Sequence, residues 1–433
     1  MNLQNASKLT FRLVSISFLF SLLSCSGITG GQSKLALDKG EISTATASQE
    51  NKLATWETKP KVVSNGNGLD MLLKTSGGMN FIYAKRNQKG RQDLFYTSSH
   101  NMGDTFMKSY PINKASGGIS AHGENNPKIR KGHGIEMFAM WQTKNAIKFS
   151  RSMNFGRSFG PEITVNDGPK KGSYNFQTMG VSPDGTIYIA WLDSRDYKTN
   201  PKGTSSIYIA RSLDQGKTFG ENIKVAGSIC PCCRPAIAFG NDGQVFIAWR
   251  HVYPGHNRVI VVASSKDKGQ TWSKEQRVTQ DGWVINGCAH SGPTMKYAKG
   301  KLYIVWYSGT NNKASLKSAV SNDNGQSFRY LGEVQGDVFD SNHPDLQIVN
   351  GEPWIIFQGR EPDKNNGWGN VRPWLTKISG NGKISKPEKL PFLGNSVSYP
   401  SLYVGGGGRI YATWTEMGDS GSKAVLCRGR VNS

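Results

Sequence analysis

The stretch SLDQGKTF, residues 212–219, follows the pattern Ser-x-Asp/Asn-x-Gly-x-Thr/Ser-Phe/Trp. Asp and Asn bond nearby backbone in tight turns, Gly accepts a positive φ, and the closing aromatic residue fixes the turn on a sheet. A recurrence of such a motif at a fixed period indicates a repeat architecture. The pattern recurs at intervals of 53 to 60 residues, in SHNMGDTF (99–106), SMNFGRSF (152–159), SKDKGQTW (265–272) and SNDNGQSF (321–328).

A second signal runs in phase with these turns. Short runs of β-branched and aromatic residues bounded by turn residues predict strands. Each run ends in a large aromatic residue: IEMFAMW (135–141), TIYIAW (186–191), VFIAW (245–249), LYIVW (302–306), WIIF (354–357) and IYATW (410–414).

Each repeat therefore predicts four strands, with the turn motif between the third and the fourth. Seven such units can be counted, and the last one ends at Ser433 after its third strand. The segment WETKPKVVS (56–64) is a fourth strand without a unit of its own. We expect it to complete the last unit and close a ring, which leaves only short edges exposed. The expected fold is an all-β propeller of four-stranded blades; seven blades are favoured, and six are the alternative.

The turn motif resembles the Asp-box, or BNR repeat, of the sialidase-type β-propellers. The resemblance covers residues 53–433 and is specific for the turns. It implies a propeller fold, although the sialidases themselves have six blades. No Arg-Ile-Pro signature, which that family carries near its N-terminus, occurs in this chain.

The N-terminus has the features of an export signal. Lys8 and Arg12 precede an apolar run, residues 13–23, that is too short to span a bilayer. The run ends in LLSC (22–25), which resembles a bacterial lipobox with Cys25 as the lipidated residue; a plain secretory signal is the alternative. We expect a signal peptide (1–24), a Gly/Ser/Thr-rich tether (25–52) and the propeller (53–433), in a lipoprotein anchored to a membrane of the bacterial cell envelope.

The chain is strongly basic, with 53 Lys and Arg against 31 Asp and Glu and a net charge of +22. Such a charge is compatible with nucleic-acid binding, but an export signal argues against that partner. The positive charges are also scattered along the chain rather than gathered in one run. Attraction to acidic glycans outside the cytoplasm is the preferred interpretation, and solubility alone is the alternative.

Propeller geometry predicts which loops share a rim. Segments before each first strand, and loops after each second-strand aromatic residue, lie opposite the Asp-box turns. Most residues whose side chains could take part in catalysis or binding fall in these loops, where several blades can direct polar groups into one pocket.

The sialidase resemblance implies an arginine clamp for a carboxylate, a tyrosine nucleophile helped by a glutamate, and an aspartate acid/base. Tyr399 is the candidate nucleophile, with Glu361 or Glu416 as its partner and Asp193 or Asp196 as the acid. The candidate substrate-binding residues are Arg195, Arg234, Arg250, Arg360, Arg372 and Trp368.

Cysteine and histidine suggest a second chemistry. The loop CPCCRP (230–235) precedes the first strand of one unit, and NGCAHSGP (286–293) precedes that of the next. Thiolates with imidazole suit zinc or copper(I), whereas export favours disulfides, so both interpretations stay open. The residues concerned are Cys230, Cys232, Cys233, Cys288, His290 and His343.

The leading hypothesis is recognition of an acidic, sialic-acid-type glycan by a monomer, with hydrolysis as an added option and no required cofactor. A Cys/His metal or redox site in the propeller mouth is one alternative. A non-catalytic surface binding module is the other, because a fold alone does not define an activity.

Overall fold

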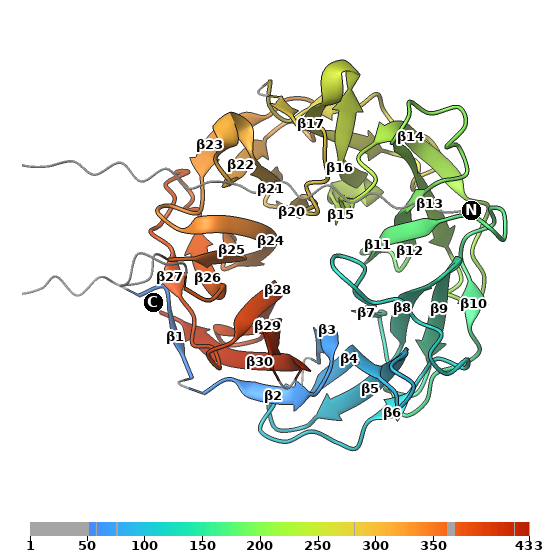
Figure 1. The fold of residues 1–433 in the computed structure, drawn as a ribbon, viewed down its shortest axis with the longest axis vertical. Helices are drawn as coiled ribbons and strands as arrows, with labels where there is room; N and C mark the ends of the chain where they lie inside the picture. Colours follow the sequence, from blue (N-terminus) through green and yellow to red (C-terminus); the bar gives the residue numbers. More distant parts are fainter. Residues whose placement is uncertain are drawn as a thin grey trace, which may run out of the picture. The chain divides into compact units, whose positions relative to one another are not determined.

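The computed structural model describes residues 52–57, 59–74, 77–280, 282–361, 369–419 and 421–432. This part of the chain consists of antiparallel β-sheets (Figure 1), which confirms the predicted all-β fold. The predicted signal peptide and Cys25 lie outside the described residues, as does the tether up to residue 51. The described residues include no helix that is long and apolar enough to cross a bilayer. The helical elements described are three short 3-10 turns: η1 (Asn241–Gly243), η2 (Pro254–His256) and η3 (Thr310–Asn312).

Four of the sheets contain four strands each, and strands that follow one another in the chain pair as neighbours. This order arises because short connections join antiparallel neighbours. The sheets are β3 (Asn67–Leu73), β4 (Met79–Arg86), β5 (Gln92–Ser99) and β6 (Tyr110–Pro111); β7 (Lys128–Lys131), β8 (Met137–Thr143), β9 (Ala146–Ser152) and β10 (Ile163–Thr164); β20 (Thr294–Ala298), β21 (Lys301–Ser308), β22 (Ser315–Ser321) and β23 (Arg329–Glu333); and β24 (Phe339–Val349), β25 (Glu352–Arg360), β26 (Arg372–Lys377) and β27 (Glu388–Lys389).

A larger sheet contains two further sets of the same kind. A single pair, Ile229 with His251, connects β14 of the first set to β16 of the second. The first set is β11 (Tyr174–Val181), β12 (Ile187–Asp193), β13 (Ser205–Ser212) and β14 (Ile223–Ile229). The second is β15 (Ala236–Phe239), β16 (Val245–Tyr253), β17 (Asn257–Ser265) and β18 (Gln276–Arg277), with β19 (Trp283–Val284) also paired to β17.

The last sheet combines the two ends of the described chain. β28 (Ser396–Val404), β29 (Arg409–Gly418) and β30 (Gly421–Val431) pair in order. The N-terminal strands β1 (Ala54–Trp56) and β2 (Lys61–Ser64) then pair with β30 on its outer side. The segment that the sequence assigned to the last unit therefore lies in the sheet of that unit.

Within residues 52–432 the sheets stand side by side around a ring (Figure 1). The first strand of each set lies nearest the centre: β3, β7, β11, β15, β20, β24 and β28.

The five repeated turn motifs adopt one geometry. In each, the backbone N–H of the motif Gly donates to the hydroxyl of the motif Ser, for example Gly216 to Ser212 at 2.8 Å. The Asp214 carboxylate accepts the Thr218 N–H and the Ser212 hydroxyl. The motif Gly residues have φ between 75° and 88°, a region that side chains disfavour. Eight residues thus contain the contacts that define the turn, which explains why the motif predicts it.

The core lies between neighbouring sheets. Each second-strand aromatic residue is buried, and Trp141 on β8, for instance, packs with Leu94 and Tyr96 of the preceding sheet. Full burial of one such side chain contributes about 1.5–3 kcal/mol. Because the apolar side chains fill the spaces between sheets, the inner strands can present polar side chains to the centre of the ring.

Candidate functional site

The inner strands enclose a central cavity of about 660 Å³. Five cationic and three anionic side chains line it, and they come from strands and loops of several sheets. The cavity therefore carries a positive excess, as expected for a site that attracts anions. These residues are Lys128, Arg130, Lys131, Arg234 and Lys296, with Asp70, Glu124 and Asp345.

Asp70 on β3 organises one side of this cavity. It accepts hydrogen bonds from Arg130 Nη1 and the Ile129 N–H, each 2.7 Å long, and from the Tyr403 hydroxyl at 2.9 Å. Burial alone would raise the pKa of Asp70, but the charges of Arg130 and Lys128 and these hydrogen bonds bring the pKa below its ordinary value. Asp70 is thus a carboxylate that already neutralises Arg130.

Lys296 on β20 has no such partner. No carboxylate of the described residues lies within ion-pair distance of its Nζ, and burial lowers the pKa of Lys296. Arg234 donates its Nη1 to the Pro235 carbonyl oxygen at 3.3 Å and, among the described residues, also has no ion-pair partner. A bound anion would stabilise both charges.

Glu124 forms the centre of a second cluster. Its buried carboxylate accepts the backbone N–H of Arg234 at 3.0 Å and that of Gly292 at 2.9 Å. His343 Nδ1 lies 3.4 Å from Glu124 Oε1, and the His343 ring packs on the Tyr399 ring with centroids 4.3 Å apart. Burial would raise the pKa of Glu124, but the hydrogen bond from His343 and the charge of Arg234 lower the pKa below its ordinary value.

Bulges direct these side chains toward the cavity. The register of β24 with β25 shifts between Asn342 and Asp345, and that of β28 with β29 shifts between Ser398 and Ser401. His343 and Tyr399 sit inside these bulges with φ of 48° and 53°. Bulges commonly turn a side chain out of the strand pattern at functional sites.

Tyr399 is a phenol under ordinary conditions. Burial, followed by the negative charge of Glu124, raises the pKa of Tyr399 to about 12. A nucleophilic tyrosine requires the opposite shift, so the environment favours hydrogen-bond donation.

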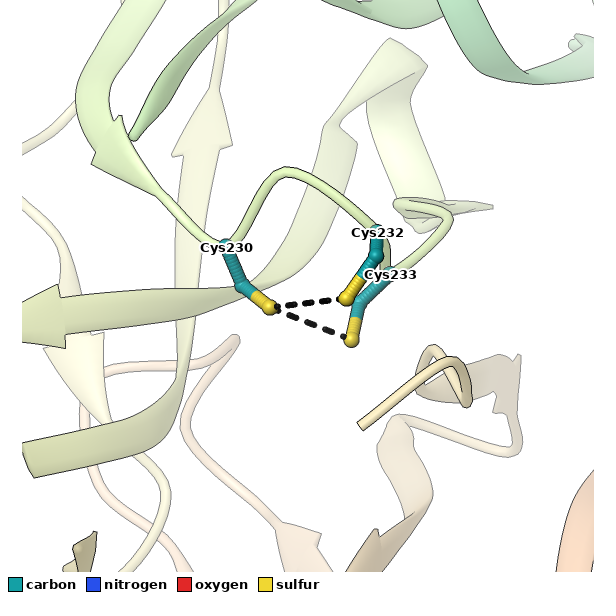
Figure 2. Close-up of side chains that lie close together, drawn as sticks. All are labelled: Cys230, Cys232 and Cys233. Carbon is teal, nitrogen blue, oxygen red and sulfur yellow. Dashed lines mark hydrogen bonds between the residues drawn. The ribbon is translucent and has the colours of Figure 1, made fainter. Parts of the chain in front are cut away.

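The three cysteines of the loop before β15 converge (Figure 2). Cys230 Sγ lies 3.5 Å from both Cys232 Sγ and Cys233 Sγ, and all three residues are buried. Cys288 and His290, which are exposed, bring their ligand atoms within 4.8 Å of Cys232 Sγ. The structure thus brings together the two predicted cysteine loops, with all five described cysteines as free thiols.

A positive environment surrounds the buried sulfurs. Arg258 Nη1 lies 2.6 Å from Cys230 Sγ, and Arg250, itself buried, adds a second charge. Hydrogen bonds from Cys232 and Cys233 first, and then these two charges, lower the pKa of Cys230 against the effect of burial. Cys230 is therefore the thiol most disposed to be a thiolate.

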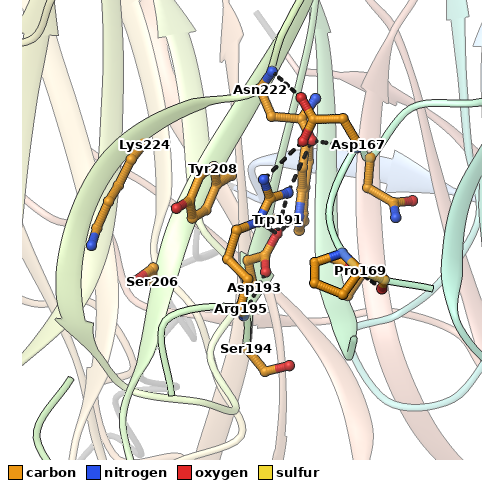
Figure 3. A network of polar contacts seen from close by, with 12 residues as sticks. Asp167, Pro169, Trp191, Asp193, Ser194, Arg195, Ser206, Tyr208, Asn222 and Lys224 are labelled. Carbon is orange, nitrogen blue, oxygen red and sulfur yellow. Dashed lines mark hydrogen bonds and ion pairs between the residues drawn. The ribbon is translucent and has the colours of Figure 1, made fainter. Parts of the chain in front are cut away.

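Asp193 and Arg195 belong to a separate polar network outside the cavity (Figure 3), and Asp196 contacts Tyr208 of the same region. Asp193 Oδ2 accepts the Trp191 Nε1–H and the Arg195 Nε–H, each at 2.9 Å, and Arg195 Nη1 also pairs with Asp167 at 2.8 Å. Asp196 accepts the Ser206 hydroxyl and pairs with Lys224 at 2.8 Å. These contacts fix the loop after β12, and Arg195 is occupied by two protein carboxylates.

The other predicted residues also have protein partners. Arg250 donates to the Ser291 and Tyr307 carbonyl oxygens. Arg360 lies 3.3 Å from Asp340, while Arg372 and Lys389 both pair with Glu361.

Glu416 accepts the Trp414 Nε1–H at 3.0 Å and the Leu393 N–H at 2.7 Å. Trp368 lies outside the described residues. Of the predicted substrate-binding residues that the structure describes, only Arg234 lines the cavity with Tyr399 and His343.

Sequence reasoning did not single out Glu124, Lys296 or Arg258. Glu124 lies in HGENNP (122–127), a segment before a first strand. The expectation that such segments share one rim could therefore have identified it. Lys296 occupies the third position of β20, and no motif surrounds it. Arg258 shows its role only through the sulfur that it contacts.

No protein-family model matches the chain. Among solved structures, an ulvan lyase of polysaccharide lyase family PL25, bound to -[GlcA(1-4)Rha3S]-, aligns with a TM-score of 0.54 and 11% identity over 86% of this chain and 95% of that chain. Polysaccharide lyase Uly1 aligns with a TM-score of 0.52 and 12% identity over 90% of this chain and 94% of that chain. A Trypanosoma rangeli sialidase aligns with a TM-score of 0.42 and 13% identity over 85% of this chain and 55% of that chain. At such low identities, similarity to the two lyases indicates a common fold but says nothing about the activity of this chain. The chain therefore has the propeller-type fold of its structural neighbours.

Proposed function

We propose that the protein recognises an acidic glycan in the central cavity, with Arg234 and Lys296 as its cationic contacts. The observation that carries the proposal is that these two cavity side chains lack an ion-pair partner among the described residues, while Arg130 beside them is neutralised by Asp70. A desolvated lysine gains most from a bound anion, and a guanidinium matches a carboxylate in geometry.

A sugar fits the remaining lining. The Tyr399 phenol and His343 offer polar atoms beside an aromatic face, a combination that suits the hydroxyl and C–H faces of a pyranose. Two fold neighbours are polysaccharide lyases, one of them bound to a glucuronate-containing saccharide, and they support the choice of ligand class. A sialic-acid-type sugar is the ligand that the Asp-box resemblance implies.

The proposal is recognition rather than hydrolysis. Tyr399 holds its proton, because its pKa is raised to about 12. Glu361 and Glu416 bond other groups, so neither is the tyrosine's partner in this proposal. Tyr399 then donates a hydrogen bond to the ligand.

Calorimetric titration of the full chain with a sialylated, a glucuronate-containing and a neutral oligosaccharide tests this function. We expect the acidic sugars to bind and added salt to weaken binding. Arg234→Ala should weaken binding about ten- to hundredfold, as the loss of a charged hydrogen bond does. Lys217→Ala is the matched control, since it removes an exposed cation in an Asp-box turn.

Two outcomes would contradict the proposal. One is equal binding of the neutral sugar, and the other is equal weakening by Lys217→Ala. If the protein released sialic acid from a fluorogenic substrate and Tyr399→Phe abolished this release, the protein would be a hydrolase and not a binding protein alone.

We also propose that the ring has seven blades, closed by β1 and β2. The seven inner strands and the pairing of both N-terminal strands with β30 support this count. Deletion of residues 53–64 should then lower the unfolding temperature markedly, because the deletion exposes the edge of β30. An unchanged unfolding temperature would contradict closure.

Finally, we propose lipid anchoring at Cys25 in the bacterial cell envelope. The apolar run and the LLSC sequence support it. Cys25→Ser should move the protein from the membrane fraction to the soluble fraction in cell fractionation. A wild-type protein without attached lipid by mass spectrometry would contradict it.

A further inference from the structure

The sulfur cluster before β15 is independent of the proposed glycan function, and its distances distinguish two chemistries. A disulfide requires sulfurs about 2.05 Å apart. Ligands about 2.3 Å from one soft metal ion lie about 3.8–4.0 Å from each other in tetrahedral or trigonal sites. The separation of Cys230 Sγ from Cys232 Sγ and from Cys233 Sγ is 3.5 Å, a hydrogen-bond contact between free thiols that is too long for a disulfide and within about 0.5 Å of the metal-site value.

Charge selects the ion. Three thiolates with a monovalent ion carry a net charge of −2, and the guanidinium groups of Arg250 and Arg258 balance it. A divalent ion would leave a positive excess in a buried site, which is costly. Arg258 Nη1 contacts Cys230 Sγ at 2.6 Å, and Arg250 is as fully buried as the sulfurs. Thiolates suit copper(I), zinc and iron–sulfur clusters, and among these copper(I) is the single monovalent ion that the charge balance requires.

The loop is held in place before any ion arrives. Glu124 accepts the N–H of Arg234, the residue after Cys233, and the N–H of Gly292, two residues after His290. A Cβ at Gly292 would clash with the Arg234 carbonyl oxygen, so the two loops meet backbone to backbone. Preformed ligand positions reduce the ordering cost of binding.

The outer side of the cluster is open. Cys288 and His290 are exposed, and their ligand atoms lie within 4.8 Å of Cys232 Sγ, which also belongs to the buried trio. Cys232 thus connects an exposed pair of soft ligands to a buried set of three. An ion held by Cys288 and His290 can therefore reach the three buried cysteines through Cys232, which belongs to both groups.

We propose that Cys230, Cys232 and Cys233 bind one copper(I) ion, and that Cys288 and His290 receive the ion at the surface. Each thiol that is still protonated releases its proton to solvent as its Cu–S bond forms, and no electron is transferred.

Anaerobic titration of the reduced full chain with copper(I), in competition with a chromogenic copper(I) chelator, tests this site. We expect one tightly held equivalent and a thiolate-to-metal absorption band in the ultraviolet. Cys233→Ala should weaken binding by about a hundredfold or more, since even indirect partners of a metal site cost about 10–100-fold. Cys427→Ala is the matched control, because Cys427 is equally buried on β30, outside both sulfur groups.

A second variant tests the surface pair. Cys288→Ala with His290→Ala changes only exposed side chains, so the fold should stay intact by circular dichroism. We expect ion transfer from the chelator to slow at least tenfold, with the final equivalent still bound. Copper(I) should also raise the unfolding temperature of the wild type and of Cys427→Ala, but not that of Cys233→Ala.

Several results would overturn the proposal. These are no competition with the chelator, equal loss in Cys427→Ala, tighter binding of zinc than of copper(I) at equal free concentration, or unchanged transfer in the surface-pair variant. If Cys233→Ala does not fold, the transfer rate of the surface-pair variant decides alone.

Discussion

Glu124→Gln should destabilise the protein by about 1–3 kcal/mol, the cost of one unsatisfied buried donor. The Glu124 carboxylate accepts N–H groups from two loops, those of Arg234 and Gly292, on residues 110 and 168 positions away in the chain. Gln keeps one acceptor oxygen and has an NH₂ group in place of the other. At the Oε2 position this NH₂ would leave the Arg234 N–H without its acceptor, and at the Oε1 position it would face the Gly292 N–H, which the two oxygens share. In either orientation a buried acceptor is lost without a large change in side-chain volume.

Urea unfolding followed by tryptophan fluorescence measures this loss. The matched control is Glu221→Gln, which removes a negative charge at an exposed position. The control should change the unfolding free energy by less than about 0.5 kcal/mol, as surface substitutions do. Equal effects of the two substitutions would refute the reasoning, since the cost would then come from net charge.

Acidification supplies a second readout. The pKa of Glu124 is lowered from its ordinary value of 4.5, because the hydrogen bond from His343 and the charge of Arg234 outweigh burial. A lowered pKa stabilises the fold at pH values above the ordinary value, and this stabilisation is lost as the pH falls through the folded-state pKa. The free-energy difference between wild type and Glu124→Gln should therefore shrink below pH 4.5. A difference that stays constant on acidification would contradict the assignment.

Two further substitutions test the local structure, each with a matched control. Asp193→Asn should lower the unfolding free energy by about 1–3 kcal/mol, because the buried carboxylate bonds Trp191 and Arg195. Asp242→Asn, in the exposed turn η1, is the control and should have little effect in the same urea titration. Gly216→Ala would place a Cβ 2.6 Å from the Phe149 ring at φ 75°, while Gly203→Ala at φ 77° meets nothing within 4 Å. Both should show the backbone cost of about 1–2 kcal/mol, and only Gly216→Ala should lose about 1–3 kcal/mol more in thermal unfolding; equal losses would contradict the clash.

The all-β fold could be predicted because the decisive contacts are local. In the Asp-box turn, Ser212, Asp214, Gly216 and Thr218 bond one another within seven residues. The strand with Trp191 needs only its own pattern of apolar residues to predict burial. Such signals survive in a single sequence because no distant partner is required.

The arginine clamp failed to assemble for the opposite reason. One partner of Arg195, Asp193, is local, but the second, Asp167, lies 28 residues earlier, and the partners of Arg250 are carbonyl oxygens 41 and 57 residues later. The sequence shows that an arginine lies on a rim, but not whether a neighbouring loop already supplies its counter-charge. The cysteine loops were easier to predict, since both precede first strands of adjacent units and such segments meet on one rim.

The sulfur cluster and the cavity share one support, and this limits how each can act. Arg234 directly follows Cys233, so an ion that fixes the Cys233 sulfur also fixes the peptide that carries the proposed anion contact. Glu124 bonds that same peptide and lies beside His343 in the cavity. That peptide is therefore held by Glu124 before an ion or a glycan binds, so the sulfur site and the anion site rely on one preformed contact.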